Sequence, residues 1–205
     1  MSTGARRANT AIGILFAIGS ACFVIGPFPG YVQHVGSSAD GITFFVGSIF
    51  FTSAALLQFV TTRLVGGGRA DWWAGGIQFV GTLFFNISTY EAMQKALDTS
   101  ATDRLVWQPD VYGSICFLVS SWIAYGAANG GYGRRVRRDT PATIALVNLI
   151  GSIAFGVSAV AAYVVPSTGD VLALGASNFT TSLGAVCFLA GAILLLPAVS
   201  SRRRS

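Results

Sequence analysis

The chain has 205 residues, of which 53% are hydrophobic and only 10% are charged, and its mean hydropathy is +0.64. Charged residues make up roughly 25% of an average soluble domain, so this composition excludes an ordinary soluble domain and indicates an integral membrane protein. The net charge of +5 does not indicate a nucleic-acid-binding protein, because the basic residues lie in short connections between apolar segments.

Six apolar segments follow one another along the chain, at residues 11–32, 41–62, 72–97, 110–129, 141–165 and 171–198. Each has about 20 residues or more, the length that an α-helix needs to cross a hydrocarbon core of about 30 Å. The connections are short, so we expect residues 1–205 to form a single integral membrane domain, an all-α bundle of six transmembrane helices. We expect the first segment to be a mature helix, because it is too long for a signal peptide and lacks a clear cleavage site.

The basic residues fall almost entirely on one side of this six-span arrangement. Of the 13 Lys and Arg residues, all but Lys95 and Arg104 lie near the termini or in the connections after the second and fourth segments. Cytoplasmic connections carry the excess of Lys and Arg, so we expect a multi-pass protein of the cell membrane with both termini in the cytoplasm. Binding of anionic lipid head groups is a second role for these clusters.

Every segment contains one copy of the same pattern: Gly, a small residue, two variable positions, Phe, two variable positions and another small residue. The glycines that begin the copies are Gly19, Gly47, Gly81, Gly113, Gly151 and Gly184. Because Gly, Phe and the last small residue lie on one face of a helix, each segment presents them as a stripe. Small residues let helices approach closely in lipid, so we expect these glycines to face neighbouring helices.

The spacing of the copies indicates three tandem helical hairpins. Successive glycines are separated by 28, 34, 32, 38 and 33 residues, and the intervals within pairs tend to be shorter than those between pairs. Such hairpins would be parallel repeats related by an axis along the membrane normal, as in some transporters. The alternative is a chance match in a chain rich in small residues. The clearest break lies at residues 130–141, where we expect Thr140 to cap the next helix and Pro141 to occupy its first position.

Residues 47–58 and 113–121, the latter preceded by Trp107-Gln108-Pro109-Asp110, resemble the YrhK-like family of bacterial integral membrane proteins. Members of that family contain a short domain of paired membrane helices with no assigned biochemical activity. The resemblance covers one or more hairpins and consists of small and aromatic residues. It implies a bacterial inner membrane protein and transfers no catalytic residue.

The densest polar cluster within any segment lies in the third, at Asn86, Tyr90 and Glu91. Ionisable groups inside a membrane are costly and are therefore candidates for function. Lys95 follows Glu91 by four residues, in the favourable order for an ion pair, so the alternative is a pair that ends the helix at the outer interface. For Asn86 the alternative is a hydrogen bond between helices.

The longest connection, residues 98–110, is a second candidate for a polar site outside the cytoplasm. Its polar and aromatic residues are Asp98, Asp103, Arg104, Trp107 and Asp110. The alternative is a solvated loop with an interfacial Trp. His34 is the single histidine, and the three cysteines lie inside segments without a CxxC pair, so we expect no metal site and no redox pair.

The sequence contains no phosphate-binding loop, dinucleotide fingerprint or acid–base constellation. We therefore expect a protein that is not an enzyme, needs no cofactor and acts through helix packing or through contacts with lipids or partners. The expected partners are membrane lipids and either a second copy of the chain or another membrane protein, but not nucleic acid. The alternative is a small-solute transporter or channel with a polar site at Asn86, Tyr90, Glu91 and Lys95. A polar cavity at Asn86 or Glu91 would favour transport, whereas a dry, Phe-filled centre would favour the first function.

Overall fold

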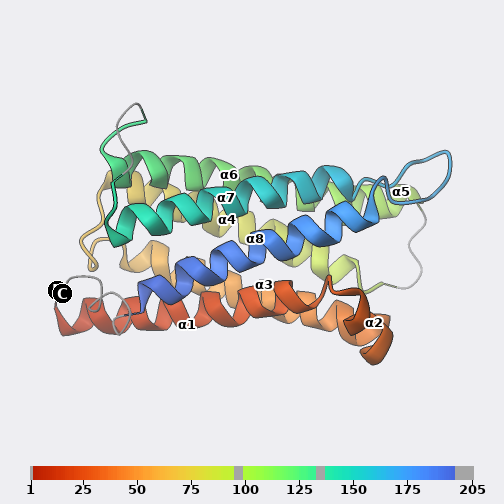
Figure 1. The fold of residues 1–205 in the computed structure, drawn as a ribbon, viewed down its shortest axis with the longest axis horizontal. Helices are drawn as coiled ribbons and strands as arrows, with labels where there is room; N and C mark the ends of the chain where they lie inside the picture. Colours follow the sequence, from red (N-terminus) through yellow and green to blue (C-terminus); the bar gives the residue numbers. More distant parts are fainter. Residues whose placement is uncertain (1, 95–98, 133–136, 197–205) are drawn as a thin grey trace.

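The computed structural model describes residues 2–94, 99–132 and 137–196, and within these ranges the protein is helical (Figure 1). An isolated bridge between Val164 and Val171 is the one β-type pairing of the described residues. The elements are α1 (Thr3–Ile25), α2 (Pro29–Val35), α3 (Ser37–Thr61), α4 (Arg69–Glu91), α5 (Thr99–Thr102), the π-helix η1 (Asp103–Trp107), α6 (Gln108–Asn129), α7 (Thr140–Ala161) and α8 (Leu174–Leu195).

The long helices form a closed ring. In chain order α1 packs against α3, α3 against α4, α4 against α6, α6 against α7 and α7 against α8, and α8 returns to pack against α1. Figure 1 shows them running along the long axis of the molecule, with α8 crossing diagonally between α7 and α1. Each helix therefore has one face toward the centre of the ring and one toward the surroundings.

Five helical stretches of the described chain are long and apolar enough to cross a membrane: α1, α3, the continuous stretch Ser100–Asn129, α7 and α8. The outward faces of the ring carry large apolar side chains, such as Ile115 on α6 and Val160 on α7, which are 53% and 64% exposed. Extended apolar surfaces of this kind mark contact with a membrane or a partner. The structure is therefore that of an all-helical bundle compatible with a membrane protein.

The helix starts differ from the sequence prediction where a capping residue was missed. α1 begins at Thr3 rather than near residue 11, because the Ser2 hydroxyl accepts a hydrogen bond from the Ala5 amide at 3.2 Å. α7 is capped by Asp139 and not by Thr140: the Asp139 carboxylate accepts the Ala142 amide at 3.0 Å. Both are ordinary N-cap bonds, which satisfy amides that lack a partner within the helix.

The connection predicted at residues 98–110 is largely helical. α5, η1 and α6 follow one another without a break, and the amide of Gln108 donates to the carbonyl of Asp103, five residues earlier. Pro109 has no amide hydrogen and interrupts the regular ladder, and the wide π turn directly before it accommodates this interruption. The preceding helix, α4, ends at Glu91 rather than at residue 97. Asp103, Arg104, Trp107 and Asp110 are therefore held on a helix, whereas Asp98 lies outside the described residues.

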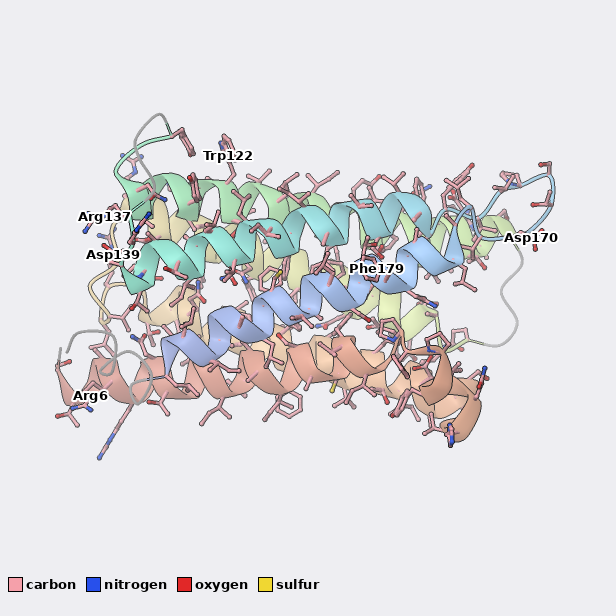
Figure 2. All side chains as sticks on the ribbon, in the orientation of Figure 1. Arg6, Trp122, Arg137, Asp139, Asp170 and Phe179 are labelled. Carbon is pink, nitrogen blue, oxygen red and sulfur yellow. The ribbon has the colours of Figure 1, made fainter. Side chains whose placement is uncertain are left out.

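The two ends of the bundle differ in charge. Figure 2 shows Arg6, Arg137 and Asp139 at one end and Asp170 at the other. We call the end that holds α2, α5 and Asp170 the α2 end (Figure 1, right). Most described Arg residues, including those on the α3–α4 and α6–α7 connections, belong to the opposite end.

Candidate functional site

The glycines of the repeated pattern meet in pairs where two helices touch. The pairs are Gly19 with Gly47, Gly81 with Gly113, and Gly151 with Gly184. A Cβ atom on Gly81 would lie 2.8 Å from the Cys116 Cβ and 2.9 Å from the Phe117 ring, and one on Gly113 would lie 2.9 Å from the Phe85 ring. Because each glycine has no side chain, the Phe ring of the partner helix can pack directly against its backbone. The same reciprocal contact occurs between α1 and α3 and between α7 and α8.

The phenyl rings of the six patterns gather in the centre of the ring of helices. This Phe cluster consists of Phe23, Phe51, Phe85, Phe117, Phe155 and Phe188. Ring centroids in contact range from 5.1 Å for Phe85 and Phe117 to 6.4 Å for Phe23 and Phe155, mostly with the edge-to-face geometry that aromatic rings favour. Phe117 is only 1% exposed. The centre of the bundle is therefore packed with aromatic side chains.

A small cavity with both phenyl rings and polar side chains in its lining lies against the Phe cluster, on the side of the α2 end. It has a volume of about 40 Å³ and is lined by residues of all six long helices: Phe23, Ser48, Phe51, Phe85, Asp110, Ser114, Phe117, Phe155, Ser158 and Thr181. Since a water molecule needs about 10–15 Å³ of such space, the cavity admits a small ion or a few water molecules. We call it the Asp110 cavity.

Asp110 supplies the carboxylate of this lining. Its side chain has no hydrogen bond or ion pair within the described part of the chain, and it is only partly exposed. Ser114 and Phe117 follow it at i+4 and i+7 on α6, so that all three side chains share one helix face. A carboxylate in apolar surroundings needs a charged or hydrogen-bonding partner, and the cavity is where such a partner would lie.

The hydroxyl groups of the cavity already donate to other atoms. Ser48 Oγ donates to the Phe45 carbonyl at 2.7 Å, and Ser158 Oγ lies 2.5 Å from Thr181 Oγ1. A hydroxyl oxygen that donates its hydrogen still has lone pairs that accept. The lining therefore combines one carboxyl group with several neutral oxygen acceptors.

A wider groove, the rim groove, opens at the α2 end. It has a volume of about 460 Å³ and is lined by Asp103, Trp107, Val160, Tyr163 and Leu172. Trp107 is fixed there because its Nε1 donates to the Ala159 carbonyl at 2.8 Å and its ring lies 4.9 Å from that of Tyr163. Asp103 accepts from Gln108 through Oδ2 at 3.1 Å, whereas its buried Oδ1 has no hydrogen-bond partner among the described residues.

The polar residues predicted on the third segment lie away from the Asp110 cavity. Asn86 faces α3, where its Oδ1 accepts from the Thr52 hydroxyl at 3.1 Å. Tyr90 is 49% exposed, and its ring packs against Phe45. Glu91 is the half-buried last residue of α4, and Lys95 lies outside the described residues. None of the described three lines either cavity.

The side chains that commonly bind metal ions do not gather at one place among the described residues. Within the described ranges no group of three or more His, Cys, Asp and Glu side chains is placed to hold a metal ion. Cys22, Cys116 and Cys187 are free thiols, and each lies opposite a glycine of the partner helix, at Gly47, Gly81 and Gly151. His34 is exposed, with Nδ1 2.6 Å from the Gly30 carbonyl.

Sequence reasoning treated Asp110 as part of the connection at residues 98–110, whereas the structure places it in the lining of a central cavity. The signal was its spacing from the repeated pattern. Asp110 precedes Phe117 by seven residues and Ser114 by four, and this spacing puts it on the face of the helix that carries the central Phe.

Comparison with families of known proteins, with characterised proteins and with solved structures gave no match. The functional assignment therefore depends on the Phe cluster, the Asp110 cavity and the rim groove.

Proposed function

We propose that this chain is a six-span integral membrane protein, similar to the YrhK-like family, that acts through helix packing and through contacts with lipids or a protein partner. It is not an enzyme in this proposal, and both termini lie in the cytoplasm. The Phe cluster is the observation that carries it. Rings from six helices pack in the centre of the bundle and leave only the small Asp110 cavity beside them. We therefore infer that the outward apolar faces are the main surface for interaction.

The position of α4 supports a sixth span. α4 has 23 residues, which corresponds to about 35 Å of helix, and it packs between α3 and α6 within the ring. Gln78 and Asn86 lower the mean hydropathy of α4. The Asn86 side chain accepts a hydrogen bond from Thr52 of α3, so it is not an unpaired polar group in contact with lipid. The charged residues of α4 lie at its two ends, at Arg69, Asp71 and Glu91.

The repeated glycine contacts support three tandem hairpins. Within each of the pairs α1–α3, α4–α6 and α7–α8, two glycines approach each other and each accommodates the Phe of its partner. A chance pattern would have no reason to form the same contact three times. The basic residues at the end opposite α2 support a cytoplasmic location for that end.

Reconstitution into liposomes tests this proposal. Purified protein should leave the permeability to Na⁺, K⁺ and glycerol equal to that of protein-free liposomes, because the central rings close the bundle. Native mass spectrometry of the same preparation should detect retained phospholipid or a second copy of the chain. The proposal would be overturned if the protein were monomeric without retained phospholipid and its liposomes were selectively permeable to one of these solutes.

A small-solute transporter or channel is the second candidate, and the Asp110 cavity is the observation that favours it. Polar groups at the centre of a membrane bundle commonly mark substrate or ion pathways. The cavity is lined by Asp110 rather than by Asn86 or Glu91, so the polar site of this candidate lies on α6 and not on the third segment. Flux that depends on Asp110 in the liposome assay would favour it.

A further inference from the structure

We propose that the Asp110 cavity binds one small monovalent cation, with Na⁺ as the best match. The Asp110 carboxylate supplies the charge. The neutral ligands are the hydroxyl oxygens of Ser48, Ser114, Ser158 and Thr181. This inference goes beyond the proposed function, because a bound cation requires only the folded bundle and neither transport nor a partner.

Charge balance points to a cation of charge +1. Asp110 is the one ionisable residue in the lining, and no basic side chain of the described chain pairs with it. Arg104 lies nearest along the sequence but is exposed, and most other described Arg residues belong to the opposite end of the bundle. A single carboxylate is neutralised by one monovalent ion, whereas a divalent ion would leave an unpaired positive charge in apolar surroundings.

The ligand atoms and the size of the cavity narrow the choice further. Carboxylate and hydroxyl oxygens suit hard cations rather than the transition metals that prefer imidazole or thiolate. A volume of about 40 Å³ is enough for an alkali ion with a few water molecules. The rings of Phe51 and Phe117 border the same space, and aromatic rings attract cations placed against their faces.

The rim groove lies at the α2 end and shares no lining residue with the Asp110 cavity. Val160, which lines the groove, and Ser158, which lines the cavity, lie on different faces of α7. Asp103 precedes Asp110 by seven residues in the continuous helical stretch, and its buried Oδ1 has no hydrogen-bond partner within the described part of the chain. A second carboxyl group thus lies about two turns closer to the α2 end, where it favours cations near that end of the bundle.

Thermal unfolding of the purified protein tests the inference. The protein is measured in detergent with NaCl, LiCl or KCl replaced by N-methylglucamine chloride at constant ionic strength. We expect a saturable rise in Tm with Na⁺, of roughly 5 °C or more at about 100 times Kd. Equilibrium binding of radioactive Na⁺ should reach one ion per chain.

Two variants connect the effect to the site. Asp110→Asn keeps the shape and removes the charge, and it should abolish both the Tm response and the bound Na⁺. Asp170→Asn makes the same change on an exposed residue at the same end, and it should respond as the wild type does. If Asp110→Asn does not fold, Ser114→Ala keeps the charge, removes one oxygen ligand and should weaken Na⁺ binding several-fold.

Three results would overturn the inference. The first is a wild-type Tm that does not distinguish alkali cations from N-methylglucamine. The second is an unchanged Na⁺ response in a folded Asp110→Asn protein or, where that variant is not available, in Ser114→Ala. The third is a Tm that varies with pH but with none of the alkali cations, since this would identify a proton as the sole occupant of the site.

Discussion

Phe155 of α7 and Phe188 of α8 stack nearly parallel, with ring centroids 5.5 Å apart and ring planes 12° from each other. The other described contacts of the Phe cluster are edge-to-face. Both stacked rings also touch Phe117, which in turn contacts Phe51 and Phe85. Phe117 is therefore one of the rings at which residues of all three predicted hairpins meet, and it is only 1% exposed.

Because of this central position, we expect truncation of Phe117 to reduce the stability of the folded protein more than truncation of an outward-facing Phe. We expect Phe117→Ala to lower the free energy of unfolding by about 3–5 kcal/mol, because four surrounding rings cannot all move into the space that is left. Unfolding in detergent measures the change. Phe179→Ala on α8 is the control, since that ring is 68% exposed (Figure 2). Equal losses in the two variants would contradict a packed centre.

The glycine contacts predict that a large side chain lowers stability at a glycine between two helices but not at a glycine with open space around it. A Cβ on Gly151 would lie 3.0 Å from both the Cys187 Cβ and the Gly184 carbonyl oxygen, whereas a Cβ on Gly156 would meet nothing within 4 Å. We expect Gly151→Leu to cost about 3 kcal/mol or more by forcing α7 and α8 apart. Gly156→Leu, on the same helix, should be neutral or slightly stabilising, because Gly is a poor helix former. The comparison fails if the thermal stability of both variants matches that of the wild type.

The sequence predicted which face of each helix packs against another helix. It did not predict which helix, or which residues of that helix, the face contacts. The spacing of Gly81 and Phe85 is visible in the chain because it follows the helical period. In the structure Phe117 packs against Gly81, and Phe85 packs against Gly113. These contacts depend on how the two antiparallel helices are aligned along their length, and a local sequence pattern does not encode that alignment. Closure of the ring by α1 and α8 is likewise a long-range contact.

The polar site was harder to predict for a physical reason. Asp110 follows a Pro and a polar stretch, which are ordinary signs of a loop, and the π turn at residues 103–107 keeps that stretch helical. Asn86 and Glu91, in contrast, are conspicuous in the sequence because they interrupt an apolar run. Asn86 bonds to Thr52 at a helix contact, and the cavity lies instead where Asp110 and hydroxyls from other helices converge.

Asp139 predicts a pH-dependent contribution to stability. The Ala142 amide bond first, and Arg137 next, hold the pKa of Asp139 below its ordinary value. Because the folded pKa is the lower one, the stabilisation is complete above the pKa of the unfolded chain, about 3.9, and is lost as pH falls through the folded pKa. Asp139→Asn keeps the cap but removes the charge. The wild type should be the more stable at pH 7, and unfolding curves should converge below about pH 4. A gap that stays constant down to pH 3 would contradict this.

Membrane topology tests whether α4 crosses the bilayer. We expect a reporter fused after Ser205 to lie in the cytoplasm, and a cysteine introduced at Asp170 in a background without native cysteines to react with an impermeant thiol reagent from outside. The reason is the charge difference between the two ends of the bundle. If α4 did not cross, the helices after it would be inverted. A C-terminal reporter on the outside would therefore refute the six-span arrangement.

The contact between Asn86 and Thr52 decides whether the third segment contributes packing or a binding site. The Thr52 hydroxyl has one hydrogen, which lies between the Ser48 carbonyl at 2.9 Å and Asn86 Oδ1 at 3.1 Å. We therefore expect a double-mutant cycle of Asn86→Ala and Thr52→Val to give a modest coupling of about 0.5–1 kcal/mol, typical of hydrogen bonds between membrane helices. Unfolding of the four proteins in detergent measures it. Glu91→Gln, which lies outside this contact, serves as the control and should leave the coupling unchanged. A coupling near zero, together with altered solute flux in liposomes for Asn86→Ala, would instead identify Asn86 as part of a binding site.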